Sequence, residues 1–302
     1  MFQYAYGWYL ARRHNCPLWL DIRSYEAAPA HGYLLDRFQI TAEVATEEIL
    51  QRIPARYQTA PEHRPRRTAL RHLWASWSGQ QLKRHKETPF GFHPRHLAVS
   101  SNRYVVGYWQ SESFFPGMRD ELLQQFRLRR PLSDASQNIV DRIRGTYSLA
   151  LHVRRGDYLS NSEAAQIYCI LGLEYYQAAI DAWAAGIPQA NLNPEIFVFS
   201  NDIPWCRSQF AHPWKTTYVD HNTAATAYED LILLSAAQSC VIANSTFSWW
   251  GAWLQQGSAN SVYAPAQWFR PNTLEARHII PESWKIVCPI SNERARGTDC
   301  PS

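Results

Sequence analysis

The second half of the chain alternates short apolar runs with amphipathic segments. Bounded runs rich in apolar and β-branched residues predict strands at 146–153, 196–200, 216–219, 240–243 and 261–264. Helical spacing of apolar residues predicts helices at 174–185 and 224–238, and a third after 240–243 that holds three tryptophans. Strands that alternate with helices in this way predict a parallel sheet.

The first half is less regular. Apolar spacing predicts a helix over 1–11, a strand over 18–21 and a helix over 41–53. A short strand is expected to end at Gly107. A helix within 132–144 has Ser133 as its candidate N-cap.

Polar residues follow directly after the predicted strand 146–153, which ends in His152 and Val153. Arg154 and Arg155 come next, then Gly156, which permits a tight turn, and Asp157. The carboxyl ends of strands in an open α/β sheet are where ligands bind, and guanidinium groups fit phosphate oxygens. The alternative is a charged loop in which Asp157 only pairs with one of the arginines.

Two other strand ends carry polar residues. Asn201 follows 196–200. Asn244, Ser245, Thr246 and Phe247 follow 240–243, where the next helix begins. Hydroxyl groups and unpaired N–H groups at a helix start can bind phosphate, although the same residues can serve as a plain N-cap.

Size and composition predict a folded protein without a membrane span. The chain has 302 residues, 46% of them hydrophobic and 19% charged, so a packed core of one large or two ordinary domains is feasible. No run approaches 18 apolar residues, and the N-terminus lacks a signal-peptide pattern. The six cysteines form no Cys-x-x-Cys pair, so we expect reduced thiols in a cytoplasmic protein.

A basic stretch interrupts the first half. Seven Lys or Arg residues lie from Arg64 to Lys86 with no acidic residue among them, and Trp74 and Trp77 lie inside it. It is interpreted as a solvated loop or as a site of peripheral contact with an anionic inner-membrane surface or a glycolipid. Basic residues interleaved with aromatics can also bind single-stranded nucleic acid, but we expect no nucleic-acid partner.

Common nucleotide-binding motifs are missing. The sequence has no Gly-x-x-x-x-Gly-Lys-Ser/Thr loop and no Gly-x-Gly-x-x-Gly, which argues against ATP and NAD sites of those types. It also has no Asp-x-Asp pair, with which many sugar transferases hold a metal ion. A diphosphate leaving group would then be neutralised by arginines and helix N-termini, so no cofactor and no metal are expected.

Three stretches resemble the α-1,2-fucosyltransferases of glycosyltransferase family 11. They are His-Val-Arg-Arg-Gly-Asp-Tyr at 152–158, Met-Phe-Gln-Tyr-Ala-Tyr-Gly at 1–7 and Ile-Ala-Asn-Ser-Thr-Phe-Ser-Trp-Trp-Gly at 242–251. The resemblance runs from the first residue to about Pro265. In the family a Gly-Leu-Gly-Asn-Gln segment precedes the second stretch; the present sequence begins at Met1, after it.

The resemblance implies an α/β fold of the GT-B type, with two Rossmann-like domains facing across a cleft. Residues 1–135 would form the acceptor side and 136–302 the GDP-fucose-binding domain. The implied reaction moves L-fucose from GDP-β-L-fucose to the 2-hydroxyl of a terminal β-galactoside. The linkage formed is α, so the anomeric centre would invert.

Further roles follow from the resemblance. Asp230 would accept hydrogen bonds from guanine, with Glu229 as the alternative, and His152 would lie near the base or ribose. The stretch 107–112, Gly-Tyr-Trp-Gln-Ser-Glu, is similar to the family's Gly-Tyr-Phe-Gln-Ser-Glu, so Gln110 and Glu112 could bind sugar hydroxyls. Glu112 could instead cap the next helix.

The catalytic base remains a choice between carboxylates. Asp157 is the first candidate and Glu112 the second, although Asp157 could serve only to orient an arginine. Two other functions stay open: transfer of another sugar or formation of another linkage, and a basic glycan- or nucleic-acid-binding module without catalysis.

Overall fold

The chain divides into two compact units, Met1–Arg129 and Arg130–Ser302. The computed structural model describes residues 1–26, 32–54, 57, 81–156, 162–188, 193–257, 260–271, 273–274 and 278–288. Within these residues each unit combines helices with parallel strands, which confirms the predicted α/β class. The facing of two domains across a cleft stays a prediction.

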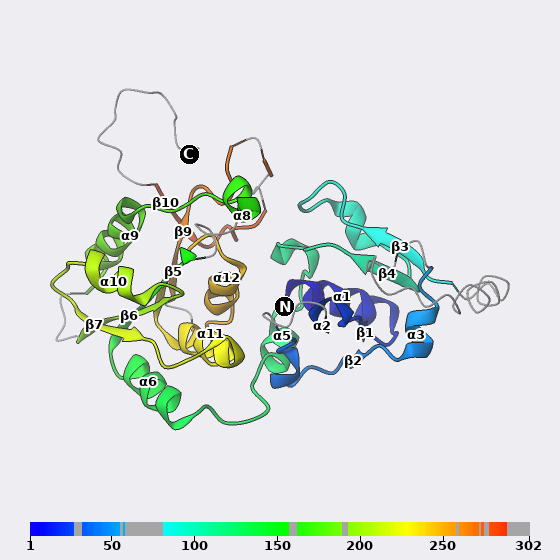
Figure 1. Ribbon diagram of the computed structural model, residues 1–302, viewed down its shortest axis with the longest axis horizontal. Helices are drawn as coiled ribbons and strands as arrows, with labels where there is room; N and C mark the ends of the chain where they lie inside the picture. The colour runs from blue at the N-terminus through cyan, green and yellow to red at the C-terminus, as the bar shows by residue number, and fades with distance from the viewer. Residues whose placement is uncertain are drawn as a thin grey trace. The chain divides into compact units, whose positions relative to one another are not determined.

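The C-terminal unit is built on one six-stranded parallel sheet (Figure 1). Its strands, in chain order, are β5 (Tyr147–Val153), β6 (Pro194–Ser200), β7 (Lys215–Val219), β8 (Ser239–Val241), β9 (Ser261–Pro265) and β10 (Lys285–Val287). In space the order is β10-β9-β8-β5-β6-β7. The chain therefore winds outward from β5 in one direction, then returns to β8 and winds in the other. This is a doubly wound order, and its direction reverses between β5 and β8.

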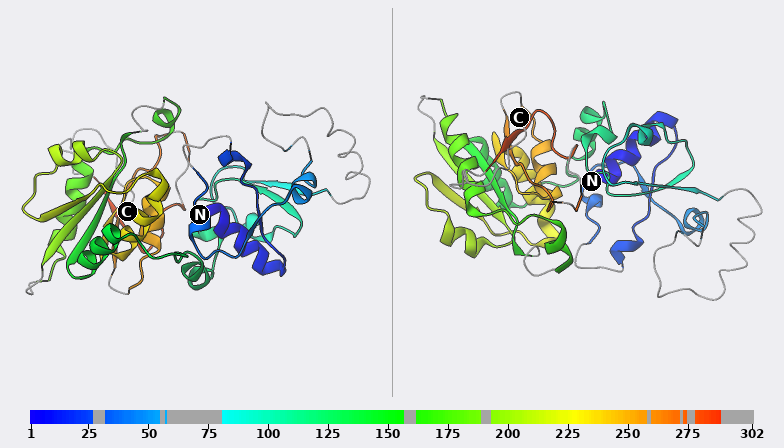
Figure 2. Two further views of the ribbon diagram at one scale, coloured as in Figure 1. Left: turned by 60° about the horizontal axis from the view of Figure 1, so that its bottom comes forward. Right: turned by 90° about the horizontal axis from the view of Figure 1, so that it is seen from above.

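Helices cover both faces of this sheet (Figures 1 and 2). α9 (Leu173–Ala185) and α10 (Ile203–Gln209) pack on one face. On the other, α11 (Ala227–Ala236) packs against both α6 (Asp134–Arg144) and α12 (Thr246–Trp253). A short helix, α8 (Ser162–Ile167), precedes α9, and the 3₁₀ turn η6 (Ala224–Thr226) precedes α11. The four predicted central strands and both predicted helices are confirmed within a few residues; β10 was not predicted.

The central strand β5 is buried on both faces. Leu149, Leu151 and Val153 belong to the core cluster that contains α9. Because side chains alternate along a strand, Ala150 and His152 face the side of α11 and α12. Burial on both faces explains why β5 reads as a continuous apolar run.

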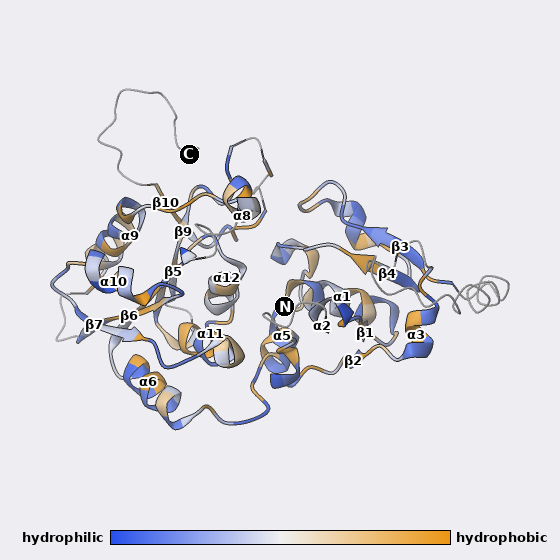
Figure 3. Cartoon of the chain, in the orientation of Figure 1, coloured by the Kyte–Doolittle hydropathy of each residue, from blue (hydrophilic) through white to orange (hydrophobic). Residues whose placement is uncertain are grey.

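Helix α6 begins and ends as its sequence predicts. The Ser133 Oγ accepts a hydrogen bond from the Ser136 N–H at 3.3 Å, and Gly145 follows the last helical residue. Val140 and Ile143 are buried, while the rest of the helix surface is largely charged, so the helix is amphipathic (Figure 3).

The N-terminal unit is assembled from short elements. Its helices are α1 (Phe2–His14), α2 (Arg23–Glu26), α3 (Glu47–Gln51) and α5 (Arg119–Gln125), with 3₁₀ turns η2 (Leu35–Arg37), η4 (Pro94–Ala98) and η5 (Glu112–Phe114). β1 (Trp19–Leu20) pairs in parallel with β2 (Glu43–Val44), and β3 (Lys83–Lys86) pairs in parallel with β4 (Arg103–Val106). α1 ends at Asn15, whose φ of 46° is left-handed, two residues before Pro17.

Two expectations were wrong. The predicted helix over 41–53 is a strand followed by a short helix, because Glu43 and Val44 pair with β1 and Thr46 caps α3. The expectation of reduced thiols fails at Cys288, which is disulfide-bonded. Cys16, Cys169, Cys206 and Cys240 are free.

Two predicted features lie outside the described residues. They are Asp157 and the basic stretch from Arg64 up to residue 80, with Trp74 and Trp77. The end of that stretch is described, and its last four residues form β3. Among the described helices, none is both long and apolar enough to cross a membrane.

Candidate active site

The loops that follow β5 and β8 flank the point where the sheet reverses its winding. The first loop holds Arg154, Arg155 and Gly156, and the second leads through Asn244 and Ser245 into α12. Neighbouring parallel strands end at the same edge of a sheet, so both loops open onto one crevice. The His152 ring at the end of β5 lies 5.5 Å from the Phe247 ring in the first turn of α12. The structure therefore brings these two predicted segments together.

The backbone of the arginine loop is held by Asn201. Its Oδ1 accepts hydrogen bonds from the N–H of Arg155 at 3.0 Å and of Gly156 at 3.3 Å. A Cβ at Gly156 would lie 2.8 Å from the Asn201 Nδ2, so the loop can approach this closely only with glycine there. Asn201 was predicted to bind the donor; its observed contact positions the loop.

The two arginines have different surroundings. The Arg155 guanidinium carbon lies 3.9 Å from the centre of the Trp205 ring, and its Nε lies 3.8 Å from an Asp202 carboxylate oxygen. Both contacts come from the start of α10. Arg154 follows His152 on the opposite face of the chain, and its charge helps to lower the pKa of that histidine. Arg154 is thus the arginine on the side of α12.

His152 is buried and neutral. Burial first, and then the charge of Arg154, lower its pKa to about 3. Its Nδ1 is buried and has no hydrogen-bond partner. A neutral imidazole with one unpaired nitrogen can donate or accept one hydrogen bond from a ligand.

The segment after β8 divides into structural and open positions. The Asn244 Nδ2 donates to the backbone oxygens of Cys169 and Trp268, both at 2.8 Å, so this buried amide ties two loops to the sheet edge. Ser245 is the N-cap of α12, and its Oγ accepts from the Phe247 N–H at 3.3 Å. The N-terminus of α12 lies at the crevice with Thr246 as its first residue, and such a terminus favours an anion.

The structure separates the two candidate carboxylates of α11. Glu229 is buried and accepts hydrogen bonds from the Oγ of Ser133 at 2.6 Å and its N–H at 3.3 Å, which ties α11 to the start of α6. Burial raises the Glu229 pKa, but the hydrogen bonds from Ser133 and Ser136 outweigh it and lower the pKa overall. Asp230 instead accepts one hydrogen bond from the Asn222 Nδ2 at 2.6 Å, and burial raises its pKa to about 6.

Trp205 was not predicted as part of the site. The signal was available, because Asp202-Ile203-Pro204 is typical of a helix start, and the Asp202 Oδ1 accepts from the Trp205 N–H at 3.2 Å. What the sequence could not show is that this first turn lies beside Arg155. Glu112 lies in the N-terminal unit, where it is the first residue of η5 behind the cap residue Ser111.

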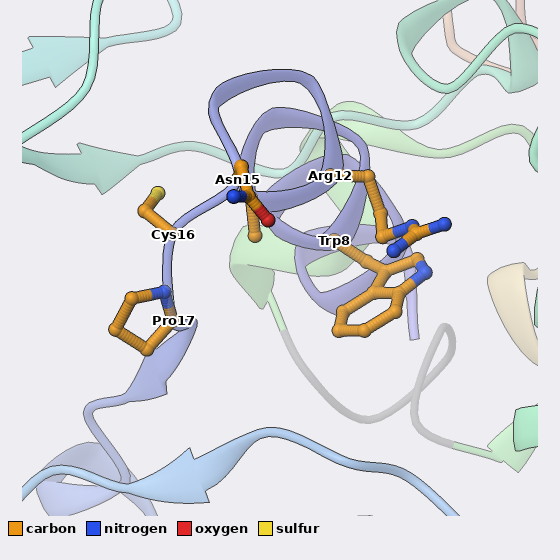
Figure 4. Close-up of a pocket in the computed structure, with 6 residues that line it drawn as sticks. Trp8, Arg12, Asn15, Cys16 and Pro17 are labelled. Carbon is orange, nitrogen blue, oxygen red and sulfur yellow. The ribbon is translucent and has the colours of Figure 1, made fainter.

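A cavity of about 260 Å³ lies at the end of α1 in the N-terminal unit (Figure 4). Trp8, Arg12, Asn15, Cys16 and Pro17 line it, together with Ala11. The Trp8 Nε1 and the Arg12 Nε contact the same Glu121 carboxylate oxygen at 3.0 and 3.1 Å. These polar groups therefore have partners within the fold, and none of the predicted site residues lines the cavity.

Over the described ranges, no three His, Cys, Asp or Glu side chains converge in a way that could hold a metal ion. Metal independence stays a prediction.

Comparison with solved structures gives a weak likeness. The fucosyltransferase NodZ from Bradyrhizobium matches with a TM-score of 0.45 and 15% identity over 84% of this chain and 88% of that chain. A NodZ α-1,6-fucosyltransferase co-crystallized with GDP matches with a TM-score of 0.46 over 84% and 87%. No inference about the fold or the site is based on likeness at this level.

Comparison of sequences is more informative. An α-1,2-colitosyltransferase from Escherichia coli is 30% identical over 290 residues, 94% of this chain and 93% of that protein. A galactoside α-(1,2)-fucosyltransferase 2 from Oryctolagus cuniculus is 25% identical over 87% of this chain and 65% of that protein. The family model described as glycosyl transferase family 11 matches residues 30–285. The predicted resemblance and the predicted enzyme class, a glycosyltransferase, are thereby confirmed: the chain belongs to glycosyl transferase family 11.

Proposed function

We propose that this enzyme is an inverting, metal-independent α-1,2-fucosyltransferase. It transfers L-fucose from GDP-β-L-fucose to the 2-hydroxyl of a terminal β-galactoside. The observation that carries the proposal is the contact between His152 and Phe247, because it joins the arginine loop to the start of α12 across the crevice. A nucleotide diphosphate fits there, between guanidinium groups and the N–H groups of a helix start.

In this proposal the C-terminal unit holds the donor. Arg154 and the N-terminus of α12 neutralise the charge that develops on the departing diphosphate, while Arg155, fixed by Trp205 and Asp202, adds positive potential. Asp230 accepts hydrogen bonds from the two adjacent N–H donors of guanine, and neutral His152 lies near the base or ribose. Family membership favours such catalysis over a binding module.

The N-terminal unit would supply the acceptor side. A base must remove the proton from the acceptor hydroxyl as the fucosyl bond forms. The two candidates are Asp157, beside the arginine loop in sequence, and Glu112 of the N-terminal unit.

The similarity to the α-1,2-colitosyltransferase favours a second candidate donor. Colitose is L-fucose without its 3-hydroxyl, so a site for one differs from a site for the other by one hydroxyl pocket. The base, the diphosphate and the inversion would be the same.

The test has two stages. Isothermal titration with GDP, UDP and ADP should show binding of GDP in preference to the other two, with EDTA present; preference for UDP would refute the proposal. Incubation with lactose and either GDP-fucose or GDP-colitose, followed by NMR of the product, identifies the sugar and the linkage. Turnover that EDTA abolishes and magnesium restores would refute metal independence.

A further inference from the structure

A second loop at the ends of parallel strands lies in the N-terminal unit. β3 and β4 pair in parallel, so Glu87, directly after β3, and Gly107, directly after β4, lie at the same edge (Figure 1). The segment 107–111 that leaves this edge is called the aromatic turn below. It is not part of the arginine crevice, and no role for it in binding follows from the C-terminal unit.

The aromatic turn adopts a costly backbone conformation. Trp109 has a φ of 57°, in the left-handed region that bulky residues rarely occupy. The Glu87 Oε2 accepts from the N–H of Tyr108 at 2.7 Å and of Trp109 at 3.0 Å, and its Oε1 accepts from the Gly91 N–H at 3.1 Å. A buried carboxylate is thus used entirely on backbone groups that fix this turn. Strain held in this way is typical of functional sites.

The turn buries one aromatic ring and presents another. Trp109 is 1% exposed and packs against the rings of Tyr6 at 4.3 Å and Phe114 at 5.2 Å. The neighbouring Tyr108 is 66% exposed, the highest value among the large hydrophobic residues of the described chain. Anchoring Trp109 therefore fixes the position from which Tyr108 projects.

Next to these rings lies a polar atom without a partner. Gln110 is 9% exposed, and its Oε1 is buried with no hydrogen bond. A buried carbonyl in this state is destabilising, and native proteins seldom retain one without a use.

We infer that the aromatic turn is a binding site for the acceptor sugar, with Tyr108 stacking on the apolar face of a neutral hexopyranoside and the Gln110 Oε1 accepting from one of its hydroxyls. An aromatic face combined with an unpaired amide oxygen is complementary to a sugar, which offers C–H groups on one face and hydroxyl donors at its rim. The nearby Glu87 is satisfied by three N–H groups, so the site suits a neutral ligand. The transfer itself rests on the proposed function above.

Kinetics with GDP-fucose and lactose test this inference. Tyr108→Ala should raise the KM for lactose about tenfold, because a stacking contact is lost. The kcat and the affinity for GDP should stay within about twofold, and Tyr108→Phe should retain the parent KM because it keeps the ring. Tyr25→Ala is the matched control, since Tyr25 is another exposed tyrosine of this unit, 38% exposed.

Gln110→Met separates binding from folding. It keeps the length of the side chain and removes the unpaired oxygen, so the melting temperature should stay the same or rise while the KM for lactose increases. A purely structural role for Gln110 predicts the opposite pattern, with lower stability and an unchanged KM.

Saturation-transfer NMR of lactose in the presence of GDP distinguishes the two proposals. If the parent enzyme does not use GDP-fucose, the proposed function fails, yet loss of the lactose signal in Tyr108→Ala would still support this site. An unchanged signal and an unchanged KM in both Tyr108→Ala and Gln110→Met would overturn it.

Discussion

The arginine loop of the C-terminal unit and the aromatic turn of the N-terminal unit are built alike and charged differently. Each follows a parallel strand, and each is fixed by one side chain that accepts hydrogen bonds from consecutive backbone N–H groups. In the arginine loop that side chain is the neutral amide of Asn201. In the aromatic turn it is the carboxylate of Glu87.

The difference follows from what each loop is proposed to bind. A carboxylate in place of Asn201 would pair with the arginines and repel a diphosphate. A carboxylate at the aromatic turn meets no such ligand, and an ionised acceptor makes the stronger hydrogen bonds needed to hold Trp109 in a left-handed conformation. The choice of acceptor thus indicates the charge of the ligand.

The largest expected effect is on the arginine loop. Arg154→Ala should lower kcat/KM for GDP-fucose roughly 10²–10³-fold, because one preorganised donor to the developing diphosphate charge is lost. Arg144→Ala removes the same charge from the end of α6 that precedes β5, at the opposite edge of the sheet, and should change little. An Arg154→Ala enzyme within tenfold of the parent would refute the role of Arg154.

The choice of a neutral amide can be tested directly. Asn201→Asp keeps the acceptor oxygen but adds a negative charge beside the diphosphate site, so the Kd for GDP should rise about 10–100-fold. Asn201→Ala removes only the loop contacts and should weaken GDP binding by about tenfold. If titration calorimetry gives the two variants equal affinities, charge is not the reason for the amide.

The reverse exchange tests the aromatic turn. Glu87→Gln replaces one acceptor oxygen with an NH₂ group that faces backbone N–H donors, which should cost about 2 kcal/mol of stability. Urea denaturation monitored by tryptophan fluorescence measures this loss. Affinity for GDP should be unaffected, and a variant as stable as the parent would show that the carboxylate does not hold the turn.

The smallest effect concerns pH. Because the folded pKa of Asp230, about 6, lies above the ordinary 3.8, this residue contributes stability that is lost as the pH rises through about 6. Binding of guanine needs the ionised form, so the Kd for GDP should rise by about tenfold per pH unit as the pH falls below 6. Asp230→Asn should remove this dependence.

The phosphate of GDP also titrates near pH 6, so the ratio of the parent and Asp230→Asn affinities is the quantity to follow. A ratio that stays constant between pH 5 and 7.5 would exclude Asp230 as the guanine acceptor. It would not restore Glu229, whose carboxylate is bonded to Ser133.

The sequence by itself determined the C-terminal sheet, the helix α6 and the polar character of the strand ends. Apolar runs and cap residues act locally or through simple burial, so β5, β6 and Ser133 could be read from their own neighbourhood. The family could also be recognised, since its motifs are contiguous.

Only the tertiary structure decided which polar groups are used up by the fold. Asn244 and Glu229 looked as available as Thr246 and Asp230, yet both are bonded to residues 24 to 96 positions away. The short strand Glu43–Val44 likewise formed where helical spacing predicted a helix, because β1 offered a partner. Such contacts join segments that are distant in the chain, and the pattern around a residue carries no information about the partner that will reach it.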